Sequence, residues 1–205
     1  MPTDAGRQGE RMVPVSWAVA VAVALAGSPL FAQSSAITET ERTFSFTLHG
    51  SDITISRTGP ACPTSCVQPM RVAPGVDTLG ELEVIAFLQS AVSSGSGLLV
   101  DVRMPGRFSS GSVPGAVNVP VATFAPDNPY RTDLLSALGV IDAGGVPNFA
   151  GAFSLVIYGG GADDGDAPDA INSLLDAGYP AGKIQYYRGG LEGWTNLGLN
   201  LSVGQ

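Results

Sequence analysis

The chain has 205 residues, of which 44% are hydrophobic, only 14% are charged and 27 are glycine. This length and composition exclude an intrinsically disordered chain and fit one globular domain with some additional sequence. The formal net charge is −8, which argues against nucleic acid and anionic membrane surfaces as partners.

The amino terminus has the three-part pattern of a secretory signal peptide. Arg7 and Arg11 precede an uncharged apolar run over 12–27, and Ala32 suits the position before a cleavage site. The run is shorter than the roughly 20 residues that a membrane span needs. An uncleaved anchor is the alternative. We expect residues 1–32 to be removed, leaving a periplasmic or secreted protein with no membrane attachment.

The two cysteines, Cys62 and Cys66, both follow this leader. In an exported protein a close pair is expected to form a disulfide, and the intervening Pro-Thr-Ser suits a turn. The C-x-x-x-C spacing differs from the C-x-x-C of thioredoxin-like oxidoreductases. Sulfur or thiol chemistry at this pair therefore stays open as an alternative.

An extension is expected ahead of the main domain. Residues 44–49 and 53–56 alternate apolar and polar side chains around a Gly-Ser-Asp turn signal, which predicts a β-hairpin. Residues 59–76 hold four prolines and both cysteines and should form an ordered loop. We therefore divide the mature chain into an extension over 33–76 and a domain over 77–205.

The domain alternates strand-like apolar runs with segments at helical spacing. Strands are expected at 98–102, 116–119, 153–158 and 183–187, and helices at 79–92, 132–138, 168–177 and 191–197. Thr78 is expected to cap the first helix and Pro168 to open the third. The order predicts an α/β fold with a central, mainly parallel sheet flanked by helices.

Three motifs in this domain resemble the rhodanese family. The first is Leu98-Leu-Val-Asp-Val-Arg103, followed by Phe108 and by Gly111-Ser-Val-Pro-Gly-Ala-Val-Asn-Val-Pro120. The others are Leu155-Val-Ile-Tyr158, then Leu174-Leu-Asp-Ala-Gly-Tyr179 and Tyr187-Arg-Gly-Gly-Leu-Glu-Gly-Trp194. The resemblance covers about residues 77–203 and implies a rhodanese-like domain.

The resemblance also implies where a nucleophile should stand. In active members a cysteine follows the strand that matches 155–158 and carries sulfur as a persulfide, inside a loop of inward-facing backbone N–H groups. Here Gly159 follows that strand. In a second register, similar to a G-x-x-x-C-G-x-S-P loop, Asp164 takes the cysteine position and Pro168 also matches. Neither register supplies a sulfur nucleophile.

The degenerate loop consists of Gly159, Gly160, Gly161, Ala162, Asp163, Asp164, Gly165 and Asp166. The family's loop arginine is missing as well, since no Lys or Arg occurs between Arg131 and Lys183. Loop carboxylates repel dianions such as thiosulfate. Two interpretations stay open: the aspartates cap the following helix, or Asp163, Asp164 and Asp166 bind a divalent cation such as calcium.

Asp101 and Arg103 end a strand in the part of an α/β sheet where sites are usually found. The resemblance gives Asp101 a loop-supporting role, and a structural ion pair between the two residues is the simpler expectation. We expect an exported rhodanese-like protein that lacks sulfurtransferase activity and uses no cofactor. It would act as a binding or accessory module for an unidentified protein or small molecule. The alternatives are a sulfur-transfer or thiol–disulfide enzyme using Cys62 and Cys66, and a divalent-cation module.

Overall fold

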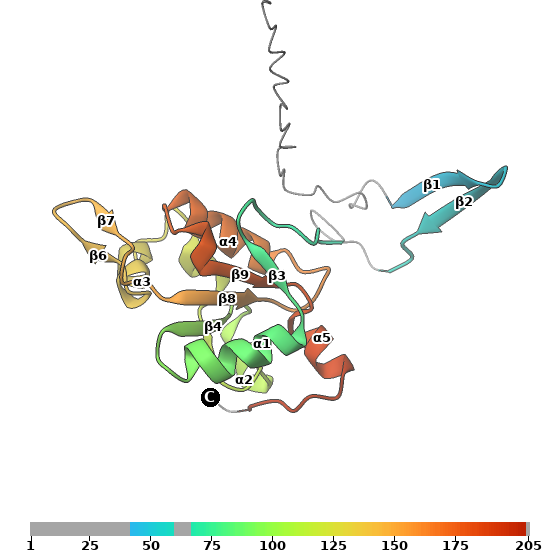
Figure 1. Ribbon diagram of the computed structural model, residues 1–205. Helices are drawn as coiled ribbons and strands as arrows, with labels where there is room; N and C mark the ends of the chain where they lie inside the picture. The colour runs from blue at the N-terminus through green and yellow to red at the C-terminus, as the bar shows by residue number, and fades with distance from the viewer. Residues whose placement is uncertain (1–41, 60–66, 204–205) are drawn as a thin grey trace, which may run out of the picture.

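The computed structural model describes residues 42–59 and 67–203. Its main body is built on a five-stranded sheet with the order β3-β9-β8-β4-β5, in which all neighbours run parallel (Figure 1). The strands are β3 (Asp77–Leu79), β4 (Gly97–Asp101), β5 (Ala116–Asn118), β8 (Ser154–Tyr158) and β9 (Ile184–Tyr187). The parallel sheet confirms the predicted fold class.

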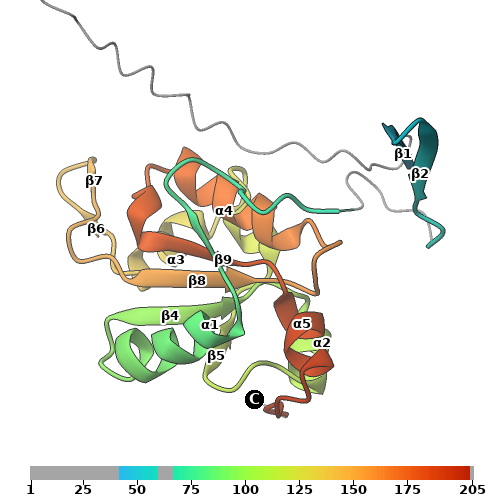
Figure 2. The ribbon, with the colours of Figure 1, turned by 45° about the vertical axis from the view of Figure 1, so that its right-hand side comes forward.

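Helices cover both faces of this sheet (Figure 2). One face carries α1 (Glu81–Phe87), its π-helical continuation Leu88–Val92, α2 (Pro105–Ser110) and α5 (Gly190–Asn196). The other carries the 3-10 turn Val121–Phe124, α3 (Arg131–Ala137) and α4 (Asp166–Asp176), and a second 3-10 turn, Ala181–Lys183, leads into β9. The layers therefore match the expected architecture.

The strand β8 shows why the apolar runs are continuous. Leu155 and Ile157 point into the core beneath α4, whereas Val156 and Tyr158 point into the core beneath α1 and α5. All four side chains have an exposed fraction of 0%. A strand covered on both faces needs apolar residues at every position, because successive side chains point to opposite faces.

Two predicted helix starts are wrong. Thr78 caps no helix: it lies in β3, pairs with Tyr186, and its hydroxyl donates to the Met70 carbonyl. The helix begins at Glu81, and the Glu83 carboxylate accepts the backbone N–H of the preceding glycine at 3.1 Å. Thr78 therefore forms part of a strand, although local capping rules favoured it as a helix N-cap. The third predicted helix, α4, begins at Asp166, two residues before Pro168.

The predicted hairpin is present as β1 (Thr43–Leu48) and β2 (Ser51–Ser56), paired antiparallel and projecting from the main body (Figures 1 and 2). A second, small hairpin of β6 (Ile141–Asp142) and β7 (Pro147–Asn148) was not expected, and neither was α2. The chain that leads into β3 packs into the main core through Val72, Ala73 and Val76.

Two predictions lie outside the described residues. These are the signal peptide over 1–32 and the disulfide between Cys62 and Cys66, and both stay predictions. None of the helices formed by residues 42–59 and 67–203 has the length and apolar character needed to cross a bilayer.

Candidate functional site

The loop over 159–166 joins β8 to α4 at the carboxyl edge of the sheet. Sites of α/β folds usually lie at this edge, because the loops that follow parallel strands converge there. The neighbouring strand β4 ends beside it, since Asp101 pairs with Tyr158 in the sheet register. The structure therefore brings both predicted site regions to one edge.

Asp164 is turned into the loop. Its Oδ2 accepts the backbone N–H of Gly160 at 2.5 Å, and its Oδ1 accepts the backbone N–H of Asp166 at 2.9 Å. The half-buried carboxylate thus joins the beginning of the loop to the first residue of α4. A negative charge at this position also gains from the positive end of the helix dipole.

The carboxylate fills the space of a side chain at position 159. A Cβ on Gly159 would lie 2.9 Å from Asp164 Oδ2, and a Cβ on Gly160 would lie 2.8 Å from the same atom. Both contacts are too short for a real side chain, so both positions need glycine while Asp164 keeps this conformation. In the first register of the rhodanese resemblance, position 159 is where the cysteine stands. The two registers therefore converge on one place in space, occupied by Asp164.

The amino-terminal end of α5 closes the loop from one side. The N–H groups of Leu191 and Glu192 donate to the carbonyls of Gly159 and Gly160, at 3.1 and 2.9 Å. Gly190 has a φ of +57°, and a Cβ there would lie 2.7 Å from the Gly159 carbonyl oxygen. Only glycine combines this conformation with so close an approach. The loop backbone is therefore held by a segment about 30 residues further along the chain.

The amino-terminal extension reaches the loop from the other side. The N–H of Gln68 donates to the Ala162 carbonyl at 2.8 Å, and Arg188 Nε donates to the Gln68 carbonyl at 2.8 Å. Arg57 Nη2 lies 3.9 Å from the carboxylate of the exposed Asp163. Described residues on both sides of the cysteine pair thus contact the loop.

Negative charges predominate around the loop and the start of α4. The pKa of Asp166 is raised by burial first and then by the charges of Asp164 and Asp169, with Arg107 acting in the opposite direction. The pKa of Asp169 is raised by burial and by Asp164. Among residues 42–59 and 67–203, no group of three or more His, Cys, Asp or Glu converges as metal ligands. Asp163 and Asp164 face different partners, as the contacts above show.

The predicted ion pair is present and buried. Arg103 Nη2 lies 2.6 Å from Asp101 Oδ2, while the Arg103 Nε and backbone N–H donate to Asp101 Oδ1 at 2.9 and 3.0 Å. Burial alone would lower the pKa of Arg103, but the hydrogen bond and charge of Asp101 leave it raised. Arg103 also donates to the Gly111 carbonyl at 2.8 Å. These contacts tie β4 to the chain leading to β5, and the loop-supporting role of Asp101 stays a prediction.

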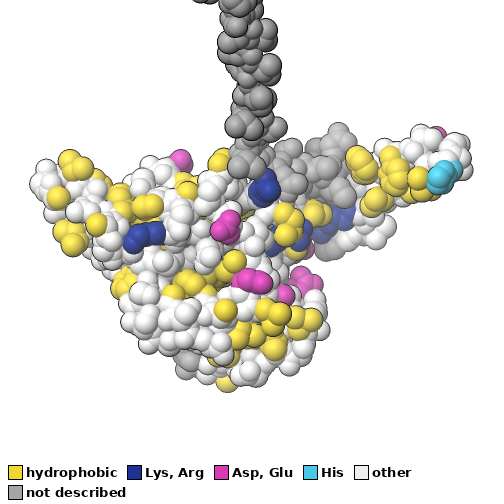
Figure 3. Space-filling view, in the orientation of Figure 1, with side chains coloured by type: hydrophobic (Ala, Val, Ile, Leu, Met, Phe, Trp, Pro, Cys, Tyr) yellow, Lys and Arg dark blue, Asp and Glu magenta, His cyan; other side chains and the backbone are white. Residues whose placement is uncertain are grey.

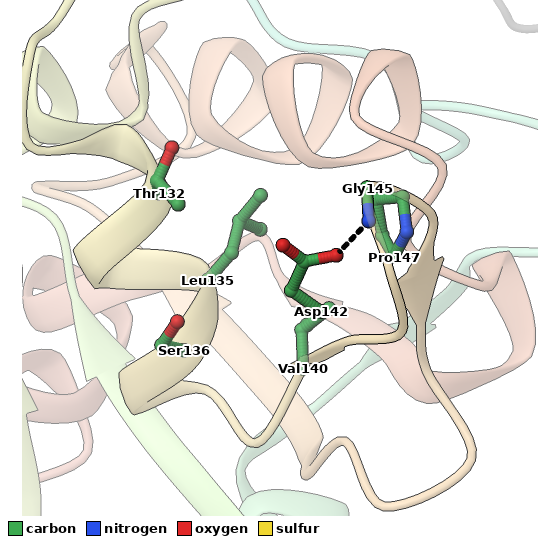
Figure 4. A pocket seen from close by; sticks show the side chains of 7 residues that line it. All are labelled: Thr132, Leu135, Ser136, Val140, Asp142, Gly145 and Pro147. Carbon is green, nitrogen blue, oxygen red and sulfur yellow. Dashed lines mark hydrogen bonds between the residues drawn. The ribbon is translucent and has the colours of Figure 1, made fainter.

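The structure has two hollows that the sequence did not predict. One, of about 290 Å³, lies beside the loop and is lined by Arg103, Gly106, Arg107, Ser110, Gly111, Leu191 and Leu201. The other, of about 220 Å³, lies between α3 and the small β6–β7 hairpin (Figure 4). In it, Asp142 Oδ1 accepts the Gly145 N–H at 2.6 Å. The sequence pattern assigned no site role to Arg107, Leu191 or Asp142, because each hollow is formed only when separate elements of the fold come together.

Comparison with solved structures gives matches of low identity. A full-length protein from Lactobacillus plantarum is 20% identical with a TM-score of 0.43, covering 62% of this chain and 87% of its own. A thiosulfate sulfurtransferase from Pseudomonas aeruginosa is 22% identical, with a TM-score of 0.43 over 63% of this chain and 21% of its own. A rhodanese-like domain from Anabaena is 19% identical, with a TM-score of 0.41 over 63% and 79%.

No curated protein matches the chain significantly. The family model of the rhodanese-like domain matches residues 85–197, which is more than half of the chain. The matched residues include β4, β8, the loop and α5, the elements that build the site. The chain belongs to the rhodanese-like domain family.

Proposed function

We propose that this domain does not transfer sulfur and acts instead as a binding or accessory module of an exported protein. The observation that carries this proposal is the position of Asp164, whose carboxylate accepts two backbone N–H groups of the loop. The same carboxylate fills the space beside Gly159. A protein carboxylate thus takes the place that a cysteine or a bound anion would need.

The chemistry supports the same conclusion. Sulfur transfer in this family requires a thiolate that forms a persulfide. The loop offers oxygen in place of sulfur, and a carboxylate cannot hold sulfane sulfur in this way. An incoming thiosulfate dianion would also meet Asp163, Asp164 and Asp166, and like charges at close range raise its free energy in the site.

The direct test is a sulfurtransferase assay on the protein as its host processes it, with thiosulfate as donor and cyanide or a thiol as acceptor. We expect no turnover above background and no gain of one sulfur atom in the intact mass. A cysteine-containing member of the family serves as the positive control. Turnover well above background would overturn the proposal. The same mass measurement shows whether residues 1–32 are removed.

A second function is favoured by one observation, and it uses sulfur chemistry at Cys62 and Cys66. Arg57 contacts Asp163 and Gln68 contacts Ala162, so the chain meets the loop on both sides of the cysteine pair. If this function holds, Cys62→Ser or Cys66→Ser abolishes turnover, and Asp164→Asn leaves it largely unchanged. Mass spectrometry after alkylation without reductant shows whether the pair is the predicted disulfide.

A further inference from the structure

The β1–β2 hairpin has an apolar face that nothing in the described structure covers. Its five large apolar side chains are Phe44, Phe46, Leu48, Ile53 and Ile55, and they keep exposed fractions of 49, 40, 49, 39 and 51%. Figure 3 shows hydrophobic side chains gathered along the arm that projects to the right, where Figure 1 labels β1 and β2. Exposed apolar patches of this kind mark interaction sites in soluble proteins.

The strand register places all five on one side. Phe44 lies opposite Ile55 and Phe46 lies opposite Ile53, while Leu48 continues the row on β1. The two phenylalanine rings are neighbours, with centroids 6.1 Å apart. Because successive side chains alternate between faces, the five residues form one continuous apolar face without a charged side chain.

The opposite face of the hairpin is polar and satisfied within the hairpin. The hydroxyls of Ser45 and Thr54 are hydrogen-bonded at 2.9 Å, and the Thr47 hydroxyl donates to Asp52 at 2.8 Å. This face therefore suits solvent. A two-stranded hairpin with one solvated and one uncovered apolar face is marginally stable alone, and further strands or a packed surface normally complete it.

We propose that a second copy of this chain covers the apolar face, by packing its own hairpin on it face to face. Two hairpins then form a four-stranded sandwich whose interior consists of the five apolar side chains from each copy. The face can pack on itself, since within β1 and β2 it consists of the five apolar side chains and Ser51, and carries no charge that would need a partner of opposite sign. A single surface patch that meets itself across a twofold axis is the commonest form of dimer interface.

The distribution of charge selects the orientation of the two copies. The hairpin region, residues 42–57, contains Arg42, Asp52 and Arg57 and so has a net charge of +1. Since the whole chain has a net charge of −8, the remaining residues have a net charge of −9. A twofold axis perpendicular to the strands places the two acidic bodies at opposite ends of the sandwich. Their repulsion is then screened over a distance longer than the roughly 8 Å Debye length of physiological salt. In this arrangement the Phe46 side chains of the two copies meet near the axis.

The buried area predicts a weak dimer. An aromatic side chain contributes about 150–250 Å² when it is fully buried, and the aliphatic Leu and Ile contribute less. Five side chains that are about half exposed therefore offer roughly 400–500 Å² per copy, or about 900 Å² for the pair. Specific stable interfaces bury about 1,200–2,000 Å². We expect reversible association with a dissociation constant in the micromolar range or weaker, as at other small interfaces.

Sedimentation velocity over a concentration series tests the proposal on the processed protein at physiological salt. We expect a monomer–dimer equilibrium in the wild type and a monomer in Phe46→Lys, since two lysines would meet at the axis. Ser45→Lys is the matched control, because it adds the same side chain to the polar face of the same strand, and it should still dimerise. A wild type that stays monomeric up to its solubility limit overturns the proposal, and so does a dimer that Phe46→Lys leaves intact.

A mixing experiment separates a lost contact from an unfolded hairpin. Phe46→Lys and Phe46→Glu should each be monomeric alone and should form a dimer when mixed, because opposite charges then meet at the axis. Two variants that stay monomeric after mixing contradict the face-to-face arrangement. Vesicles of neutral phosphatidylcholine provide the remaining comparison: binding of a monomeric wild type to them would assign the face to a membrane surface and overturn the dimer.

Discussion

The ends of β4 and β8 lie side by side in the sheet. β4 ends at the buried Asp101, and β8 is followed by the loop that holds the half-buried Asp164. Asp101 is neutralised by the side chain of Arg103, two residues away, and both are buried. The Asp164 carboxylate accepts hydrogen bonds from the backbone N–H groups of Gly160 and Asp166. One carboxylate thus has a full countercharge, whereas within residues 42–59 and 67–203 the other is held by backbone dipoles and forms no ion pair.

This difference in partners distinguishes a structural ion pair, at the end of β4, from the candidate functional loop that follows β8. The buried pair at β4 is complete without a ligand, and its hydrogen bonds lock the strand end to the chain that follows. The loop at β8 keeps inward-facing N–H groups, the feature by which such loops bind anions, but its own carboxylate accepts two of them. In the proposed function, the loop keeps an anion-binding backbone while its own carboxylate takes the place of the anion.

The largest loss of stability is expected when the Asp101–Arg103 pair at the end of β4 is broken. Asp101→Ala leaves the Arg103 guanidinium buried without its countercharge, and breaking such a pair costs about 3–5 kcal/mol of unfolding free energy. Urea denaturation measures the change. Asp77→Ala, which removes an exposed aspartate from β3, is the control and should stay within about 0.5 kcal/mol. The double variant Asp101→Leu with Arg103→Met should lose less than Asp101→Ala alone, because no unpaired charge is left. An equal or greater loss in the double variant would show that burial of the charge is not the cause.

A smaller effect is expected in the loop, and it should depend on Asp164. Gly159→Ala places a methyl group 2.9 Å from Asp164 Oδ2, and overpacking of this kind costs about 1–3 kcal/mol. In an Asp164→Gly background the methyl group has room, so the added cost of Gly159→Ala should fall by more than about 0.5 kcal/mol. Gly182→Ala is the matched control, since a Cβ there meets nothing within 4 Å. Strictly additive losses in the double-mutant cycle would mean that the carboxylate does not occupy this space.

The same contrast explains how much the sequence could predict. The continuous apolar runs predicted four of the five strands of the sheet, and the Asp101–Arg103 pair followed from two residues close together in one motif. Local rules failed at Thr78, because its pairing with Tyr186 depends on a strand more than 100 residues away. They could not show which segments close the loop, since the contacts of Gln68 and Glu192 are tertiary. Asp164 was a candidate by register, but only the folded backbone shows its carboxylate beside Gly159.

The smallest expected effect is the pH dependence of folding stability that Asp166 causes. Burial, and then the charges of Asp164 and Asp169, raise its pKa in the folded state above the ordinary 3.8. The folded protein therefore holds this proton more tightly than the unfolded chain does. The corresponding stability is fully present below about pH 3.8, and it is lost as the pH rises through the folded-state pKa. Asp166→Asn cannot ionise and should avoid that loss.

We therefore expect Asp166→Asn to be more stable than the wild type at neutral pH, with the difference vanishing in acid. Since Asp166 is partly exposed and screened by solvent, the gain should be only a few tenths of a kcal/mol. Thermal denaturation across a pH series measures it. Asp133→Asn removes a first-turn aspartate from α3 and reports what losing the favourable helix-dipole interaction costs by itself. If Asp166→Asn is destabilised at neutral pH as much as this control, repulsion between Asp166 and its acidic neighbours does not reduce the stability of the folded protein. The loop carboxylates would then stabilise the start of α4 as helix caps. They would differ from the buried Asp101 only in their partners, which are backbone N–H groups in place of an arginine side chain.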